Sequence, residues 1–174
     1  AKLAGKKLPP LLSGLSGAES IKSVKEVDES PIGRTPRSVP ATYVGIMDAI
    51  RQVFSRTPES RARGYTAGRF SFNVAGGRCE KCQGAGFLQV GMHFLGDVEI
   101  VCDACNGMRF NQETLEIKHK GKNIFEVLEL SVHEAVRFFS DKPKILRIVE
   151  TLDDLGLGYL KLGQRSTTLS GGEA

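Results

Sequence analysis

The chain has 174 residues, of which 40% are hydrophobic and 25% are charged, and its formal net charge is +4. This length is enough for one domain of ordinary size or two small ones, and the composition is normal for a soluble protein. No apolar run approaches the length of a membrane span, which excludes an integral membrane protein built on helices.

The first forty residues predict little regular structure. Residues 1–20 are rich in Gly, Ser, Pro and Leu, so we expect a poorly ordered edge. Residues 28–40 contain three prolines and one glycine, which break helices and strands. They predict a polar loop that displays Arg34 and Arg37.

A helix and a strand are expected next. Thr42 can cap a helix that runs to about Arg56, because its apolar residues recur on one face. Residues 59–74 interleave arginines with aromatics, a pattern that fits nucleic-acid contact and equally fits a strand with an apolar face. We favour packing for the aromatic residues, with the apolar face formed by Phe70, Phe72 and Val74.

The positive charge is concentrated in one segment. Between Arg34 and Arg78 lie eight arginines, no lysine and only two acids, an excess of six positive charges. Guanidinium groups match phosphate oxygens in geometry, so this segment is a candidate phosphate-binding surface. A solvated face is the alternative, and composition does not separate the two.

All four cysteines lie in two C-x-x-C pairs, Cys79–Cys82 and Cys102–Cys105, with nineteen residues between them. Such pairs direct four thiolates at one tetrahedral ion. The sequence shows no signal peptide, so an oxidising compartment, in which disulfides form, is not indicated. The spacing predicts a closed, structural zinc site. Four unrelated buried or disulfide-bonded cysteines are the alternative, and His93 is a less favoured competing ligand.

The residues between the pairs alternate between apolar and polar from Phe87, and the alternation resumes at Val98. Gly96-Asp97 interrupts it. The pattern predicts a β-hairpin with its turn at Gly96-Asp97, which carries the second pair back to the first, as in a zinc ribbon.

The C-terminal part is expected to be mainly helical. Residues 114–119 predict a strand, and two capping boxes begin at Asn123 and Ser131. Pro143 opens a further helix that Gly156 closes. The chain then ends in Leu-Ser-Gly-Gly-Glu over residues 169–173, which matches the signature motif of ATP-binding-cassette ATPases; a Ser-Gly helix cap is the alternative.

Taken together, these residues resemble the UvrA family, the damage-recognition ATPases of bacterial nucleotide excision repair. The resemblance covers residues 21–174 and rests on motifs that occur in the family's order: SPIGRTPRS (30–38), ATY (41–43), ESRARGY (59–65), GRFSFNV (68–74), GGRCEKCQG (76–84), CDAC (102–105), ETLEIK (113–118), LGQ (162–164) and TTLSGGEA (167–174). It departs from the family at Glu29, where glutamine is usual, and at Val39, where asparagine is usual.

The resemblance implies an α+β fold: a mainly helical signature domain of the second nucleotide-binding half, with an inserted four-cysteine, zinc-ribbon-like β-hairpin module. We expect four parts. Residues 1–20 form an edge, 21–74 an arginine-rich loop, helix and strand segment, 75–110 the zinc module, and 111–174 the helical domain that ends in the signature motif.

The resemblance also implies binding roles. The residues expected to contact nucleotide are Ser170, Gly171, Gly172, Glu173 and Glu29. Glu29 stands where the family usually has glutamine. For DNA we expect backbone contacts from Arg34, Arg37, Arg61, Arg63, Arg69 and Lys81. DNA binding should alter ATP hydrolysis through residues 160–168.

No G-x-x-x-x-G-K-[ST] phosphate loop is present, and the Walker B acid is missing too, so the chain alone should not hydrolyse ATP. We expect structural Zn²⁺ here, and ATP with Mg²⁺ only in a longer parent protein. The implied partners are damaged double-stranded DNA, a UvrB-type protein outside this segment and a second copy of the parent, with no membrane, in the bacterial cytoplasm at the nucleoid.

A second function remains open. Cys79 to Gly86 fits the C-x-x-C-x-G-x-G unit of DnaJ-type zinc modules, which bind unfolded peptide. The second pair does not fit this unit, because Arg109 stands where the unit needs glycine. Only two units are present, where that family carries four.

Overall fold

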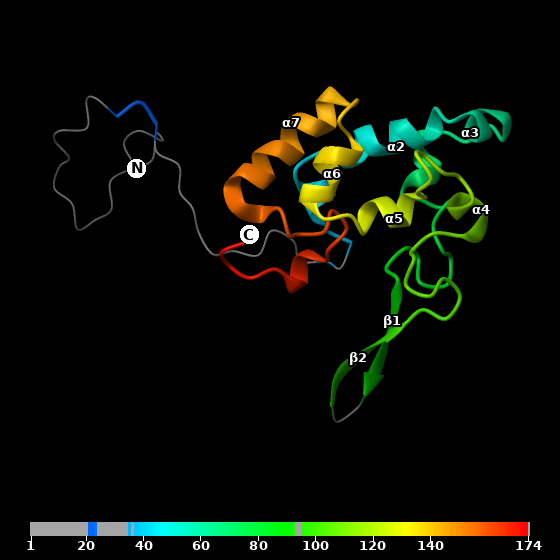
Figure 1. The fold of residues 1–174 in the computed structure, drawn as a ribbon. Coiled ribbons are helices and arrows are strands. Elements are labelled where there is room, and N and C mark those ends of the chain that lie inside the picture. The colour runs from blue at the N-terminus through cyan, green and yellow to red at the C-terminus, as the bar shows by residue number, and fades with distance from the viewer. Residues whose placement is uncertain (1–20, 24–34, 36, 93–94, 174) are drawn as a thin grey trace, which may run out of the picture. The chain divides into compact units, whose positions relative to one another are not determined.

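The computed structural model describes residues 21–23, 35, 37–92 and 95–173 (Figure 1). The expected edge at residues 1–20 lies outside them. The chain divides into two units, residues 1–30 and residues 31–174, and the second unit holds every helix and strand described below.

The second unit is mainly helical and carries one two-stranded antiparallel sheet, which confirms the mixed fold class. Its α-helices are α1 (Pro40–Tyr43), α2 (Met47–Ser55), α3 (Pro58–Ala62), α4 (Gln112–Leu115), α5 (Ile124–Leu128), α6 (Val132–Phe138) and α7 (Pro143–Leu152). The strands are β1 (Phe87–Met92) and β2 (Leu95–Val101). Three short turns of other helix types are η1 (Ala67–Phe70), η2 (Asp153–Leu157) and η3 (Ser166–Thr168).

The prediction of a single helix from Thr42 to Arg56 is wrong at its N-terminal end. Two helices occupy the region, and Gly45 between them has a φ of +78°, which breaks the helical path. Thr42 does not cap α2. Its hydroxyl donates to the carbonyl of Val39 and accepts from the Val39 N–H, which closes the short α1 instead.

The strand expected within residues 59–74 is also wrong. Pro58 opens α3, with Thr57 as a capping residue that accepts from the Ser60 N–H, and η1 follows. The predicted packing role of the aromatics is confirmed at Phe70 and Phe72, which are buried. The local helix-start signals at Thr57 and Pro58 outweigh the weak alternation.

Residues 114–119 were expected as a strand, but α4 begins at Gln112. The Asn111 side chain accepts from the Thr114 N–H, so asparagine acts as an N-cap in front of a short helix. The alternation of Leu115 and Ile117 misled the prediction because both side chains are buried from a helix end and a turn.

The capping signals further along are confirmed. Asn123 and Ser131 form capping boxes with Glu126 and Glu134, and α5 and α6 follow them. Pro143 is the first residue of α7. Gly156, at a φ of +82°, ends the helical path beyond it as predicted.

One hydrophobic core joins these helices. Its largest fully buried side chains include Phe54, Phe70, Phe139, Ile145 and Leu162. None of the described helices has both the length and the apolar run that crossing a bilayer would require.

The β1–β2 hairpin leads away from the helices (Figure 1). Phe87 pairs with Val101 at its base and Met92 with Leu95 at its far end, with a register shift between Val90 and Met92. The turn expected at Gly96-Asp97 is therefore wrong, because both residues lie in β2, and the connection at residues 93–94, with His93, falls outside the described residues. Val90, Val98, Ile100 and Val101 are exposed.

Candidate metal centre and its connections

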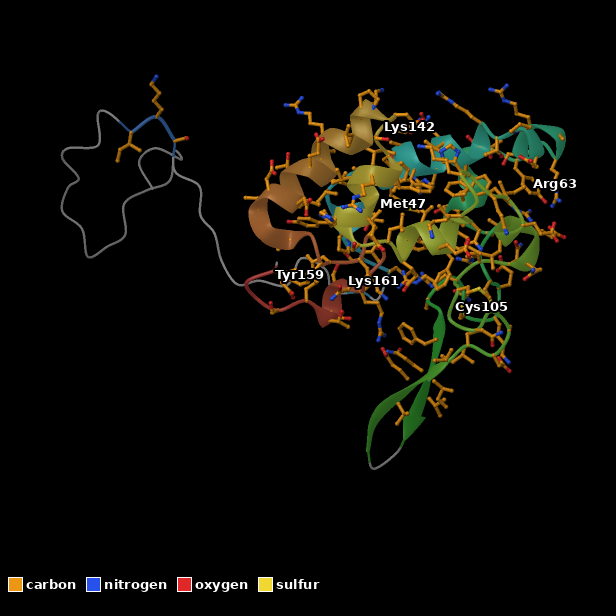
Figure 2. The ribbon with its side chains drawn as sticks, viewed as in Figure 1. Met47, Arg63, Cys105, Lys142, Tyr159 and Lys161 are labelled. Carbon is orange, nitrogen blue, oxygen red and sulfur yellow. The ribbon has the colours of Figure 1, made fainter. Side chains whose placement is uncertain are left out.

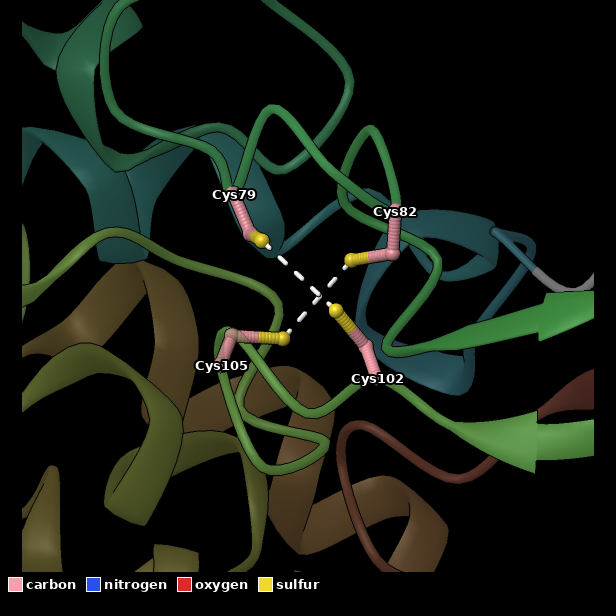
Figure 3. Close-up of side chains that lie close together, drawn as sticks. All are labelled: Cys79, Cys82, Cys102 and Cys105. Carbon is pink, nitrogen blue, oxygen red and sulfur yellow. Dashed lines mark hydrogen bonds between the residues drawn. The ribbon is translucent and has the colours of Figure 1, made fainter.

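The four cysteines meet at the base of the hairpin (Figure 3). Cys79 and Cys82 lie before β1, and Cys102 and Cys105 follow β2, so the antiparallel pairing of the strands brings the two pairs together. All four side chains are buried and none forms a disulfide. Leu88 is the hydrophobic side chain that packs against this cluster, which otherwise consists of the cysteines themselves.

The sulfur positions fit one tetrahedral ion. The Sγ atoms of Cys79 and Cys102 are 3.9 Å apart, those of Cys82 and Cys105 are 3.7 Å apart, and all four lie within 4.8 Å of one another. A tetrahedral Zn–S bond of about 2.3 Å places the sulfurs roughly 3.8 Å apart. A disulfide would need about 2.05 Å. The cluster can therefore hold a metal ion.

The two cysteine pairs are built alike. The first and second residues after each pair, Gln83-Gly84 and Asn106-Gly107, all have positive φ. The N–H of Cys79 donates to the Arg109 carbonyl over 2.8 Å, and the N–H of Cys102 donates to the Gly86 carbonyl over 3.0 Å. Each pair thus fixes the other through the residue four positions past its second cysteine.

Two glycines of this segment are required by close backbone contacts. A Cβ on Gly84 would lie 1.8 Å from the Phe72 carbonyl oxygen, and a Cβ on Gly77 would lie 1.6 Å from the Arg69 carbonyl oxygen. The glycines of the sequence pattern therefore seat the cysteine loops on residues 69–72 of the helical part.

The thiols of Cys79 and Cys105 resist ionisation. Burial raises the pKa of Cys79. Burial and the neighbouring sulfurs of Cys82 and Cys102 raise the pKa of Cys105 to about 12. At Cys102 burial acts in the same direction, but N–H groups of Cys105 and Ala104 outweigh it and lower the pKa. Four thiolates at these distances need a cation among them.

Sequence reasoning missed Arg109. This residue has a φ of +69°, where the first cysteine unit has Gly86, and its side chain is buried. Its guanidinium lies 5.3 Å from the Phe72 ring centroid and donates to the Gly163 carbonyl over 3.3 Å, while burial lowers its pKa. The available sequence signal was an arginine at the position where the first cysteine unit has glycine. The Arg109 side chain ties the segment after Cys105 to the loop before the signature motif.

Arg165 makes a second connection from the same loop. Its guanidinium donates to the Glu99 carboxylate on β2 over 2.5 Å and lies 4.7 Å from the ring centroid of Phe87 on β1. Gly163 and Arg165 therefore contact the loop that follows the second cysteine pair and the hairpin. No local pattern indicates this pairing, because 66 positions separate its two charges.

The residues expected to contact DNA fall into separate places. Arg37 and Lys81 line one hollow of about 440 Å³ beside Cys82, and Lys81 also pairs with Asp103. Arg61 is exposed on α3. Arg34 lies outside the described residues.

The other two arginines are engaged within the fold. Arg69 lies 4.3 Å from the Tyr65 ring centroid and bonds Thr114 and Glu113 around α4. Arg63 pairs with Glu116. These ion pairs attach η1 and α3 to α4, so both arginines have a packing role whatever else they bind.

The signature residues form an exposed turn at the described end of the chain. Ser170, Gly171 and Gly172 are exposed. The Glu173 carboxylate accepts from the Ser170 N–H over 2.7 Å and from the Tyr159 hydroxyl over 2.6 Å, and these bonds lower its pKa. The two glycines and the serine hydroxyl therefore stay accessible to a ligand. Glu29 lies outside the described residues.

Comparison with known proteins gives consistent relatives. No family model matches the chain. It is 59% identical over 170 residues to UvrABC system protein A of Oceanobacillus iheyensis, which is 98% of this chain, and 55% identical over 166 residues to the same protein of Staphylococcus aureus, which is 95%. The crystal structure of UvrA2 from Deinococcus radiodurans matches 85% of the chain with a TM-score of 0.81 and 57% identity.

The chain spans about 18% of the length of each of these relatives. The sequence and fold comparisons therefore agree, because the relatives found by both are UvrA proteins.

Proposed function

Nearly the whole chain is homologous to one segment of UvrA, and from this premise we propose that it is the DNA-contacting, ATP-sensing signature part of a longer damage-recognition ATPase of nucleotide excision repair. The observation that carries the proposal is the 59% sequence identity to UvrABC system protein A, which extends over 98% of the chain. We also propose that the parent protein lies in the cytoplasm, binds a UvrB-type partner and pairs with a second copy of itself.

Within this part, the metal is proposed to be structural zinc. The four cysteines fill all coordination positions of a tetrahedral ion, so no position is open for a substrate. Of the described hydrophobic residues, only Leu88 packs against the cysteines, so hydrophobic contacts stabilise this cluster little. Bound zinc would stabilise it by cross-linking the two cysteine pairs. Residues 75–110 are the proposed zinc module, and residues 111–174 the proposed helical domain.

For ATP, we propose that Ser170, Gly171 and Gly172 close over a nucleotide held elsewhere in the parent assembly. Their exposure supports this, as does the hydrogen bond by which the Tyr159 hydroxyl holds Glu173. The chain lacks a phosphate loop, so the site requires a second surface.

The peptide-binding alternative finds no support in the relatives, which are UvrA proteins. A direct assay separates the two functions. The zinc-loaded chain should bind a duplex oligonucleotide in low salt and should leave an unfolded peptide unbound. The reverse preference would overturn the DNA assignment.

We expect the Arg37 and Lys81 hollow to contact the DNA backbone. Replacing both residues by alanine in the full-length protein should lower the slope of log affinity against log salt by about two units, because each phosphate contact contributes roughly one. Fluorescence anisotropy at several salt concentrations measures it. Arg147→Ala, an exposed arginine on α7, is the matched control and should leave the slope unchanged.

We also expect the Arg165–Glu99 pair to transmit DNA binding to the signature motif. Arg165→Glu should leave hydrolysis without DNA within about twofold and reduce the change that DNA causes, because like charges then repel the hairpin from the loop. Combining it with Glu99→Arg should restore the response, since the swapped pair can form again. A double variant as defective as Arg165→Glu alone would contradict this role.

A further inference from the structure

A second cavity lies away from the metal centre. It has a volume of about 800 Å³ and is bounded by α2, the start of α3, residues 118–120 and the start of α7. None of the residues expected to bind DNA, nucleotide or metal lines it. Figure 2 shows Lys142, one of its lining residues, at the end of α7 that approaches α2.

Its walls are strongly basic. Five cations line the cavity against the single carboxylate of Glu59, and they come from three separate stretches of chain: Arg56, Lys118, Lys120, Lys142 and Lys144. Asp141 at the rim pairs with Lys120 and Lys142. Counting both acids, the fold still gathers an excess of three positive charges around one hollow.

Three of these cations have no ion pair among the described residues: Arg56, Lys118 and Lys144. Lys142 and Lys144 also stand at the N-terminal end of α7, where the helix dipole disfavours cations. α7 has no capping side chain and no acid in its first turn, unlike α5 and α6 with their glutamates. An anion in the cavity would relieve this repulsion.

The environment of His119 is a second indication that the cavity is positively charged. Its ring packs edge-on near Phe54 and Phe138, and its Nε2 atom is buried without a hydrogen-bond partner in the described part of the chain. Burial, and then the charges of Lys142 and Lys120, lower its pKa. Hydrogen bonds from Lys120 and Lys142 hold the pKa of Asp141 far below its usual range.

We propose that this cavity is a phosphate-binding site. Three unpaired cations and the start of α7 would hold the anion, and the apolar side chains of Ala49, Val53 and Ile145 would contact the remainder of the ligand. The phosphate could belong to a free nucleotide or to the backbone of DNA. The site is independent of the proposed ATP and DNA functions, because it shares no residue with either.

The test uses the zinc-loaded chain with three probes: inorganic pyrophosphate, ATP without magnesium, and a duplex oligonucleotide. Titration is followed by calorimetry and by the NMR signal of the His119 ring, which reports binding inside the cavity. Lys144→Glu and Arg56→Glu should each weaken binding about tenfold or more, because each removes one charge-assisted contact and adds a carboxylate that repels the anion. Arg147→Glu changes the same charge on the same helix outside the cavity and should weaken binding less than twofold.

The probes separate the sources. Binding of pyrophosphate or ATP that shifts His119 identifies a nucleotide-type site, and a His119 shift with the duplex alone identifies a DNA backbone contact. The proposal is overturned if no probe shifts the His119 signal, or if Arg147→Glu costs as much as Lys144→Glu. Failure here leaves the proposed ATP and DNA roles standing, since those variants lie elsewhere.

Discussion

Replacing Cys102 by serine is expected to abolish stable zinc binding and to unfold the β1–β2 hairpin, while the helical core keeps its packing. The Cys102 side chain is fully buried and supplies one of the four clustered sulfurs. Structural zinc sites of this kind contribute about 10–16 kcal/mol of apparent binding free energy, and serine is a poor substitute for a thiolate.

Among the described residues, little besides the strand pairing and the contacts of Arg165 with Glu99 and Phe87 would then hold the hairpin. Four of its apolar side chains are exposed, and a lone two-stranded hairpin is marginal in water. The helical core is a separate cluster of buried residues that contains none of the cysteines. Loss of the metal should therefore unfold one part of the chain and spare the other.

Metal analysis and amide hydrogen exchange measure the two effects. Lys81→Ala is the matched control, because Lys81 lies between two of the four cysteines, is exposed and supplies no ligand. It should retain one zinc per chain and the protection of the strand amides. The structural role is refuted if Cys102→Ser also retains both.

The clustering of the four cysteines was predictable because its signal is local. C-x-x-C spacing and apolar alternation specify ligands and hairpin whatever surrounds them, and the sulfur geometry fits those four residues. The capping boxes at Asn123 and Ser131 were readable for the same reason, since cap and partner are three residues apart.

Features that depend on distant residues were not predictable. The strands expected near residues 70 and 115 fail because alternation also arises where a short helix and a turn both face a core. Arg109 was read as a defect in the second cysteine unit, whereas it adopts the glycine-type conformation and bonds Gly163. The cavity cations come together only once α7 lies against α2.

Replacing Gly171 by aspartate is expected to reduce ATP hydrolysis by the full-length protein about a hundredfold or more. A carboxylate beside a phosphate adds bulk and like charge, and loss of one preorganised contact to a reacting oxyanion already costs about 100- to 1,000-fold. The effect should appear in steady-state rates at saturating ATP and should leave zinc content and DNA affinity unchanged.

The fold gives little reason for this variant to be unstable. Gly171 is exposed and is not among the glycines with positive φ, so its φ does not require glycine. The turn is held by Glu173, through the Ser170 N–H and the Tyr159 hydroxyl, and not by the glycine. A loss of hydrolysis would therefore report on contact with the nucleotide.

Two further variants separate the causes of that loss. Gly171→Ala adds a methyl group without charge and should cost much less than Gly171→Asp if electrostatic repulsion dominates. Thr167→Asp places the same charge on an exposed position of η3, in the same loop, and should leave hydrolysis within about threefold if the repulsion is confined to the signature turn. The phosphates that Ser170 and Gly171 would contact must be held by a second surface of the parent assembly. The isolated chain should therefore show negligible ATP affinity at this turn in every variant. Full hydrolysis by Gly171→Asp would remove the signature turn from the ATP site and leave Glu173 with a structural role alone.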